Sequence, residues 1–203
     1  MLDVVSNQKS YAEIAVILKK YGIGGISDTL ITRLEESAKN IPPEVLLNKT
    51  AILLTEVGCG TTDYDTWEWT PFRNGVYSFD VEILNVEKMY TNFLLGIAAI
   101  GEGELDFKNI TEDISGVDWE KGTGKRTVSF EWNGCTYTLE AECLHDWFDP
   151  DFAAELNKII IAQGNGKRLY FTDDGYQQCI VFYRTNDWAD AFQKETGLLL
   201  SEK

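Results

Sequence analysis

Residues 58–82, GCGTTDYDTWEWTPFRNGVYSFDVE, mark the place where the chain changes from one pattern of apolar residues to another. Before them, apolar side chains recur with the spacing of helices; after them, alternating runs and a hairpin pattern predict strands. The segment itself holds two of the six tryptophans, five carboxylates and a Gly-Cys-Gly turn. We therefore interpret it as the joint between a helical subregion, residues 1–57, and a sheet-containing core, residues 58–203.

Three helices are predicted in the helical subregion. Ser10 and Glu13 have the spacing of a capping box at the start of the first helix. Ser27 or Asp28 can cap the second helix. The third covers residues 43–58, with a proline in its first turn, where the missing N–H is tolerated.

The strongest pattern in the chain is a β-hairpin over residues 125–142, with an Asn133-Gly134 turn of the favoured two-residue type. In this register Trp132 faces Cys135, and further hydrophobic pairs follow on the same face. The opposite face is polar and acidic. The elements expected next are a helix over residues 149–164, a second hairpin over 167–183 and a final helix over 186–197.

These patterns predict a single α+β domain over residues 1–203. A helical unit is followed by a mostly antiparallel sheet with packed helices, in the order hairpin, helix, hairpin, helix. A length of 203 residues with 44% hydrophobic residues is enough for a packed core. We expect a monomer or a weak homodimer.

The net charge of −15 is concentrated in the middle of the chain, because residues 61–157 hold 20 of the 33 acidic residues and only 6 of the 18 basic ones. Such a field repels nucleic acid and anionic membranes. It also speeds the encounter with a basic protein. A solvated acidic face without a partner would give the same composition.

The features that bear on location favour the cytoplasm. The start MLDVVSNQKS lacks the basic and apolar regions of a signal peptide, and no apolar run approaches the roughly 20 residues that span a bilayer. The four cysteines contain no C-x-x-C pair, and we interpret them as reduced and mostly buried.

The aromatic and acidic residues of the joint are the candidate partner-binding site. Aromatic anchors rimmed by charge are typical of the centre of a protein interface. In a strand Trp67 and Trp69 would point the same way, so we expect both to face the partner or both to face the core. The candidate residues are Asp63, Tyr64, Asp65, Trp67, Glu68, Trp69 and Phe72.

An enzyme site is the alternative. His145, the single histidine, lies near Asp146 and Asp149 and could act as a general base or a metal ligand of a hydrolase. A loop histidine that is hydrogen-bonded to a neighbouring carboxylate would look the same. One histidine excludes multi-histidine zinc sites, and the Asp63-x-Asp65 spacing lacks the glycine and glutamate of a calcium loop. We expect no cofactor and no metal.

The ββα units over residues 125–163 and 167–195, with the Trp-rich acidic loops, resemble the small acidic immunity proteins of bacterial toxin systems. The resemblance implies a cytoplasmic protein that binds a cognate toxin domain, often a basic nuclease, and blocks its active site. A third possibility is a structural or regulatory protein that packs its helical subregion on another protein.

Overall fold

A computed structural model describes residues 9–42 and 48–202 of the protein. The expected start of the third helix at Pro43 lies outside the described residues. The helices are α1 (Tyr11–Lys20), α2 (Asp28–Ala38), α3 (Lys49–Gly58), α4 (Met89–Ile100), α5 (Pro150–Ala162) and α6 (Asn186–Thr196), with a short 3₁₀ turn at Val86–Lys88 before α4.

The strands form three antiparallel sheets. One contains β4, β5, β6 and β7, another has the order β3-β9-β8, and β1 pairs with β2 in a small two-stranded arm. The strands are β1 (Thr61–Asp63), β2 (Glu68–Thr70), β3 (Tyr77–Asp80), β4 (Lys108–Asp113), β5 (Val117–Asp118), β6 (Thr123–Trp132), β7 (Cys135–Glu142), β8 (Lys167–Asp173) and β9 (Gln178–Thr185).

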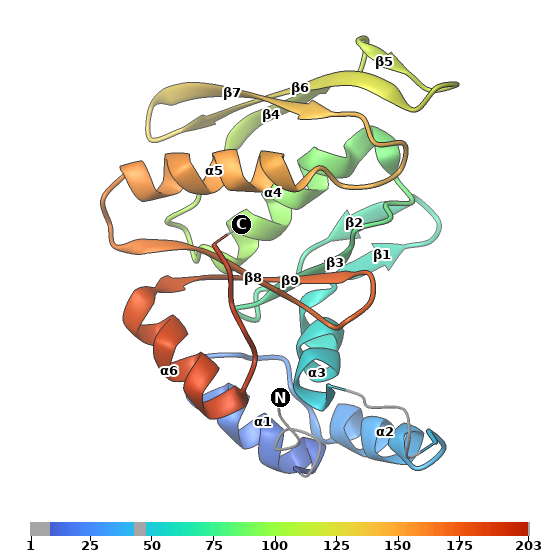
Figure 1. Ribbon diagram of the computed structural model, residues 1–203, viewed down its shortest axis with the longest axis vertical. Coiled ribbons are helices and arrows are strands. Elements are labelled where there is room, and N and C mark those ends of the chain that lie inside the picture. Colours follow the sequence, from blue (N-terminus) through green and yellow to red (C-terminus); the bar gives the residue numbers. More distant parts are fainter. Residues whose placement is uncertain (1–8, 43–47, 203) are drawn as a thin grey trace.

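The elements stack in four layers (Figure 1). The β4–β7 sheet lies at the top, α4 and α5 lie below it, the β3-β9-β8 sheet comes third, and α1, α2, α3 and α6 cover its lower side. The α+β class is therefore confirmed, and β6, β7, α5, β8, β9 and α6 follow the predicted order of hairpin, helix, hairpin, helix.

Local sequence signals account for several of these elements. The capping box is present, since the Glu13 amide donates to Ser10 Oγ at 3.2 Å and the Ser10 amide donates to Glu13 Oε2 at 2.8 Å. The β6–β7 hairpin has the predicted register, with Trp132 opposite Cys135. Its two-residue turn places Asn133 at φ 51°, a left-handed value that asparagine tolerates.

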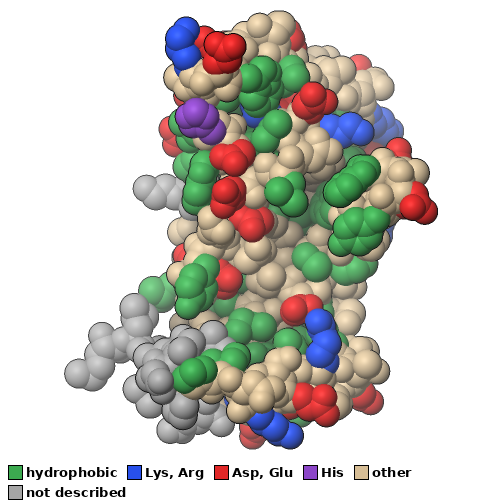
Figure 2. All heavy atoms as spheres, turned by 90° about the vertical axis from the view of Figure 1, so that its right-hand side faces the viewer, with side chains coloured by type: hydrophobic (Ala, Val, Ile, Leu, Met, Phe, Trp, Pro, Cys, Tyr) green, Lys and Arg blue, Asp and Glu red, His purple; other side chains and the backbone are tan. Residues whose placement is uncertain are grey.

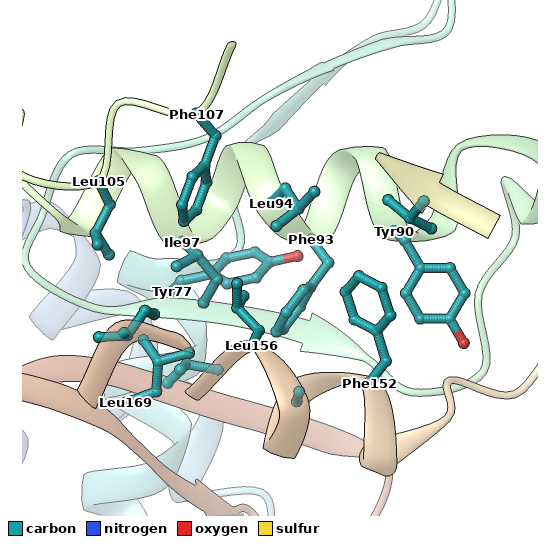
Figure 3. Close-up of a cluster of buried hydrophobic side chains, with 14 of the residues drawn as sticks. Tyr77, Tyr90, Phe93, Leu94, Ile97, Leu105, Phe107, Phe152, Leu156 and Leu169 are labelled. Atoms are coloured by element: carbon teal, nitrogen blue, oxygen red, sulfur yellow. The ribbon is translucent and has the colours of Figure 1, made fainter. Parts of the chain in front are cut away.

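The β3-β9-β8 sheet is buried on both faces and joins two hydrophobic clusters. Val181 and Tyr183 of β9 belong to the upper cluster, which α4, α5 and the top sheet complete. Ile180 and Phe182 point the other way, into a lower cluster with α1, α3 and α6. Figure 3 shows the upper cluster, where side chains of α4 and α5 meet those of β3 and β8; the labelled residues are Tyr77, Tyr90, Phe93, Leu94, Ile97, Leu105, Phe107, Phe152, Leu156 and Leu169.

The cysteine interpretation was wrong in one respect. All four thiols are free, but Cys59 and Cys135 are exposed and only Cys143 is fully buried. Cys135 pairs with the buried Trp132 but is itself exposed, as is Thr136, at the end of β7 next to the turn. Among the helices of the described residues, none has both the length and the apolar character needed to cross a bilayer.

Candidate protein-binding groove

The β1–β2 arm is organised by the first of its acidic residues. The Asp63 carboxylate accepts hydrogen bonds from the amides of Asp65 at 2.8 Å and Thr66 at 3.3 Å, and the Trp67 amide donates to the Asp63 carbonyl at 2.7 Å. This is the local pattern that lets aspartate start a turn. The carboxylate of Asp63 therefore holds the arm in shape.

The two tryptophans of the arm do not share one environment, so that prediction was wrong. Trp67 is the last residue of the turn rather than part of a strand, has φ 59°, and is 68% exposed. Trp69 lies in β2, and its ring packs on Tyr77 at a centroid distance of 5.7 Å. Its indole N–H donates to the Cys59 carbonyl at 2.9 Å. The turn geometry at Trp67 breaks the alternation on which the prediction depended.

Gly60, next to the arm, leaves room for the ring of Trp69. A Cβ at Gly60, where φ is +74°, would lie 2.6 Å from Trp69 Nε1. Both the backbone angle and the close approach favour glycine at this position. The Gly-Cys-Gly turn is thus a packing feature that seats Trp69 against the core.

A groove of about 980 Å³ separates the arm from β3 and from the 3₁₀ turn. Tyr64 and Trp67 flank it from the arm, and their rings meet edge to face with centroids 6.1 Å apart. Leu84 also lines the groove and is 99% exposed. The other apolar residues that line the groove are Cys59, Trp69, Tyr77, Phe79, Ile83, Val86 and Met89.

Among the residues that the structure describes, the charged side chains that line the groove are all carboxylates, namely Asp80, Glu82, Glu87 and Asp146. In the part of the chain that the structure describes, none of these four takes part in an ion pair. Figure 2 shows this side of the molecule, with acidic side chains gathered over its middle and hydrophobic side chains protruding at the right-hand edge. The groove therefore combines exposed apolar surface with uncompensated negative charge.

The predicted site is only partly assembled in this groove. Tyr64, Trp67 and Trp69 line it. Of the remaining candidates, Asp63, Asp65 and Glu68 belong to the arm and Phe72 follows it, and none of the four contributes to the lining.

The carboxylates of the groove come instead from other segments. Asp80, Glu82 and Glu87 were not selected from the sequence, and Asp146 was assigned to the alternative enzyme site. Val81 and Ile83 are half-buried, whereas Glu82 and Leu84 are exposed. This alternation was visible in the sequence as the continuation of a strand. In that alternation Leu84 falls on the same side as Asp80 and Glu82, and a leucine among acids was the available signal.

The residues of the alternative enzyme site have separate roles. Asp149 caps α5, with its carboxylate oxygens accepting from the amides of Asp151 at 3.0 Å and Glu142 at 2.9 Å. Asp146 lines the groove, and His145 is exposed with its ring against Gly122. Among the described residues no group of three or more histidines, cysteines or carboxylates is placed to hold a metal ion.

A buried ion pair lies at the start of α4, away from the groove. The Glu112 carboxylate accepts from the amides of Tyr90 at 3.2 Å and Thr91 at 3.0 Å, and from Arg126 Nη1 at 3.1 Å. The side chains of Arg126 and Glu112 are 1% and 3% exposed. Burial raises the pKa of Glu112, although the Thr91 amide and Arg126 act in the opposite direction.

The guanidinium of Arg126 is also enclosed by two aromatic rings, those of Trp119 at 5.1 Å and Tyr90 at 5.7 Å. Glu112 thus supplies from β4 the cap that α4 lacks in its own sequence, since Lys88 at the N-cap position makes no side-chain bond. We interpret this cluster as structural because it ties the top sheet to the helix.

No model of a known protein family matches this chain, and neither a curated protein nor a solved structure does. The function of the groove is therefore inferred from its own side chains, their exposure and their charge.

Proposed function

We propose that the protein is a protein-binding module that holds a basic partner in the groove. The observation that supports this proposal is the combination of three exposed anchors, Tyr64, Trp67 and Leu84, with a charged lining made only of carboxylates. An immunity-type protein that neutralises a basic toxin or enzyme would use such a surface. We include a cytoplasmic location in the proposal, since four free thiols suit a reducing compartment.

The anchors would supply most of the affinity. Tyrosine and tryptophan are enriched among residues whose truncation costs an interface more than about 1 kcal/mol. Leu84, at 99% exposure, buries nothing in the free protein and has its whole side chain available for contact. Covering it releases about 0.8 kcal/mol for each buried CH₂ group.

The carboxylates would select the partner. A surface with Asp80, Glu82, Glu87 and Asp146 and no lysine or arginine in its lining favours a positively charged protein and disfavours an acidic one. It also disfavours nucleic acid, whose binding depends on neutralising phosphates. Charge at the rim acts mainly on the association rate and its salt dependence.

Calorimetric titration against the product of the gene next to this one tests the proposal. We expect Leu84→Ala to weaken binding about tenfold, while Leu199→Ala leaves it unchanged. Leu199 is a matched control because it is 65% exposed and does not line the groove. Equal affinities for both variants would show that the partner binds elsewhere.

A second pair of variants tests the charges. Glu82→Lys should slow association, whereas Glu131→Lys, an exposed site on β6 outside the groove, should not. If both variants changed the association rate alike, the overall charge of the protein rather than the groove would attract the partner.

A further inference from the structure

Two features of Trp67, its backbone angle and its exposure, are unfavourable for the stability of the domain. Its φ of 59° lies in the left-handed region, which glycine and asparagine adopt far more readily than a bulky residue. Its side chain is 68% exposed, so most of the indole surface stays in water. A strained and exposed tryptophan at the end of a turn indicates that the side chain is kept for a contact outside the domain.

The neighbouring ring of Tyr64 indicates which kind of group Trp67 can contact. Tyr64 is 77% exposed, and its ring stands at 82° to the Trp67 ring. Two open aromatic rings at right angles form a corner with negative π faces. Such faces attract a cation placed within about 6 Å of a ring centroid.

The surroundings favour a cation over an apolar side chain. The corner opens into the groove that Asp80, Glu82, Glu87 and Asp146 line, with no basic residue in the lining to occupy the aromatic faces. The contrast with Arg126 is informative, because that guanidinium already lies between Trp119 and Tyr90 in the same protein. Among the described residues, by contrast, no cation lies over the rings of Tyr64 and Trp67.

We propose that the corner formed by Tyr64 and Trp67 binds an arginine side chain of the basic partner, and that the groove carboxylates receive the cationic side chains that follow it. The planar guanidinium stacks on aromatic faces and is more weakly hydrated than an ammonium group, so arginine is favoured over lysine. This inference rests on the proposed function and specifies which group of the partner the site recognises.

Peptides in which arginine alternates with glycine provide the direct test. Titrated into ¹⁵N-labelled protein, the arginine peptide should shift the indole N–H signal of Trp67 and leave that of Trp119 in place. A peptide with citrulline in place of arginine keeps the shape without the charge and should cause no shift. Equal shifts from both peptides would overturn the proposal.

Variants of the corner separate π contact from simple apolar contact. We expect Trp67→Leu to bind the arginine peptide about fivefold more weakly, the size of one exposed cation–π contact, and Trp67→Phe to recover part of the loss. Unchanged affinity in Trp67→Leu would overturn the proposal.

Competition distinguishes this inference from the proposed function. If the arginine peptide displaces the partner, and the citrulline peptide does not, both stand. If the partner binds and depends on Leu84 but the arginine peptide neither binds nor competes, the arginine assignment is wrong and the proposed function remains. If the partner binds without any dependence on Leu84 or Trp67, both are wrong.

Discussion

Trp67 and Trp69 are two positions apart, and we expect their removal to have very different effects on stability. Trp67→Gly removes a side chain of which about a third is covered in the folded protein. The lost burial lowers the free energy of unfolding by about 1 kcal/mol, after allowance for a compact denatured state. Glycine lowers the free energy of unfolding by about 0.5–1 kcal/mol more, because its backbone loses more conformational entropy on folding. Glycine also removes the strain of the left-handed backbone at this position, which raises the free energy of unfolding by about 1 kcal/mol. The free energy of unfolding should therefore fall by less than about 1 kcal/mol.

Trp69→Ala removes a ring packed on Tyr77 and a hydrogen bond to the Cys59 carbonyl. Large aromatic residues replaced by alanine in a core typically cost about 3–5 kcal/mol. Since Trp69 is half-buried at the edge of its cluster, we expect a loss near the lower end, about 3 kcal/mol.

Urea unfolding followed by circular dichroism measures both variants. The slope of the free energy against urea concentration should be the same in wild type and variants, so that the midpoints report stability. A loss of more than about 2 kcal/mol in Trp67→Gly would refute the reasoning, since Trp67 would then be a structural residue and its strain would need no partner. Equal losses in the two variants would contradict the different environments assigned to the two tryptophans.

Three further outcomes follow from the polar contacts. Arg126→Met should cost about 3 kcal/mol at neutral pH, because it leaves Glu112 buried without its cation; the folded-state pKa of Glu112 is raised above its ordinary 4.5, so its protonation favours folding, and urea unfolding should show part of the loss recovered as the pH falls toward about 5. Asn157→Leu should lower the free energy of unfolding by about 2–4 kcal/mol and speed amide hydrogen exchange at Leu169. The Asn157 side chain accepts a hydrogen bond from the Leu169 amide at 2.8 Å and donates to the carbonyls of Leu169 at 3.0 Å and Glu202 at 2.8 Å. Raising salt from about 50 mM to about 300 mM should slow association with the partner in stopped-flow measurements, and an unchanged rate would exclude electrostatic attraction.

The sequence was sufficient where a local pattern determines the structure. The register of the β6–β7 hairpin follows from Asn133-Gly134 and the alternation around it, and the α1 cap follows from Ser10 and Glu13. In each case the interacting groups are neighbours in the chain or are brought together by one tight turn.

The sequence did not predict the contacts between segments that are distant in the chain. The cap of α4 comes from Glu112, which is 22 residues from Tyr90 in the chain, and no spacing rule connects the two. The groove needed the arm, β3 and the loop that carries Asp146 to come together in space. The different exposures of Trp67 and Trp69 depend on a turn whose length the sequence pattern left open.

The strand β9 contributes alternate side chains to the two hydrophobic clusters, with Val181 above the sheet and Ile180 and Phe182 below it. Loss of packing on one side would release the strand and expose the other side as well. The two cores therefore cannot melt one after the other, and the domain should unfold in a single cooperative step. Because the wall of the groove at β3 pairs with β9, that cooperativity also keeps this wall in place until the whole domain unfolds.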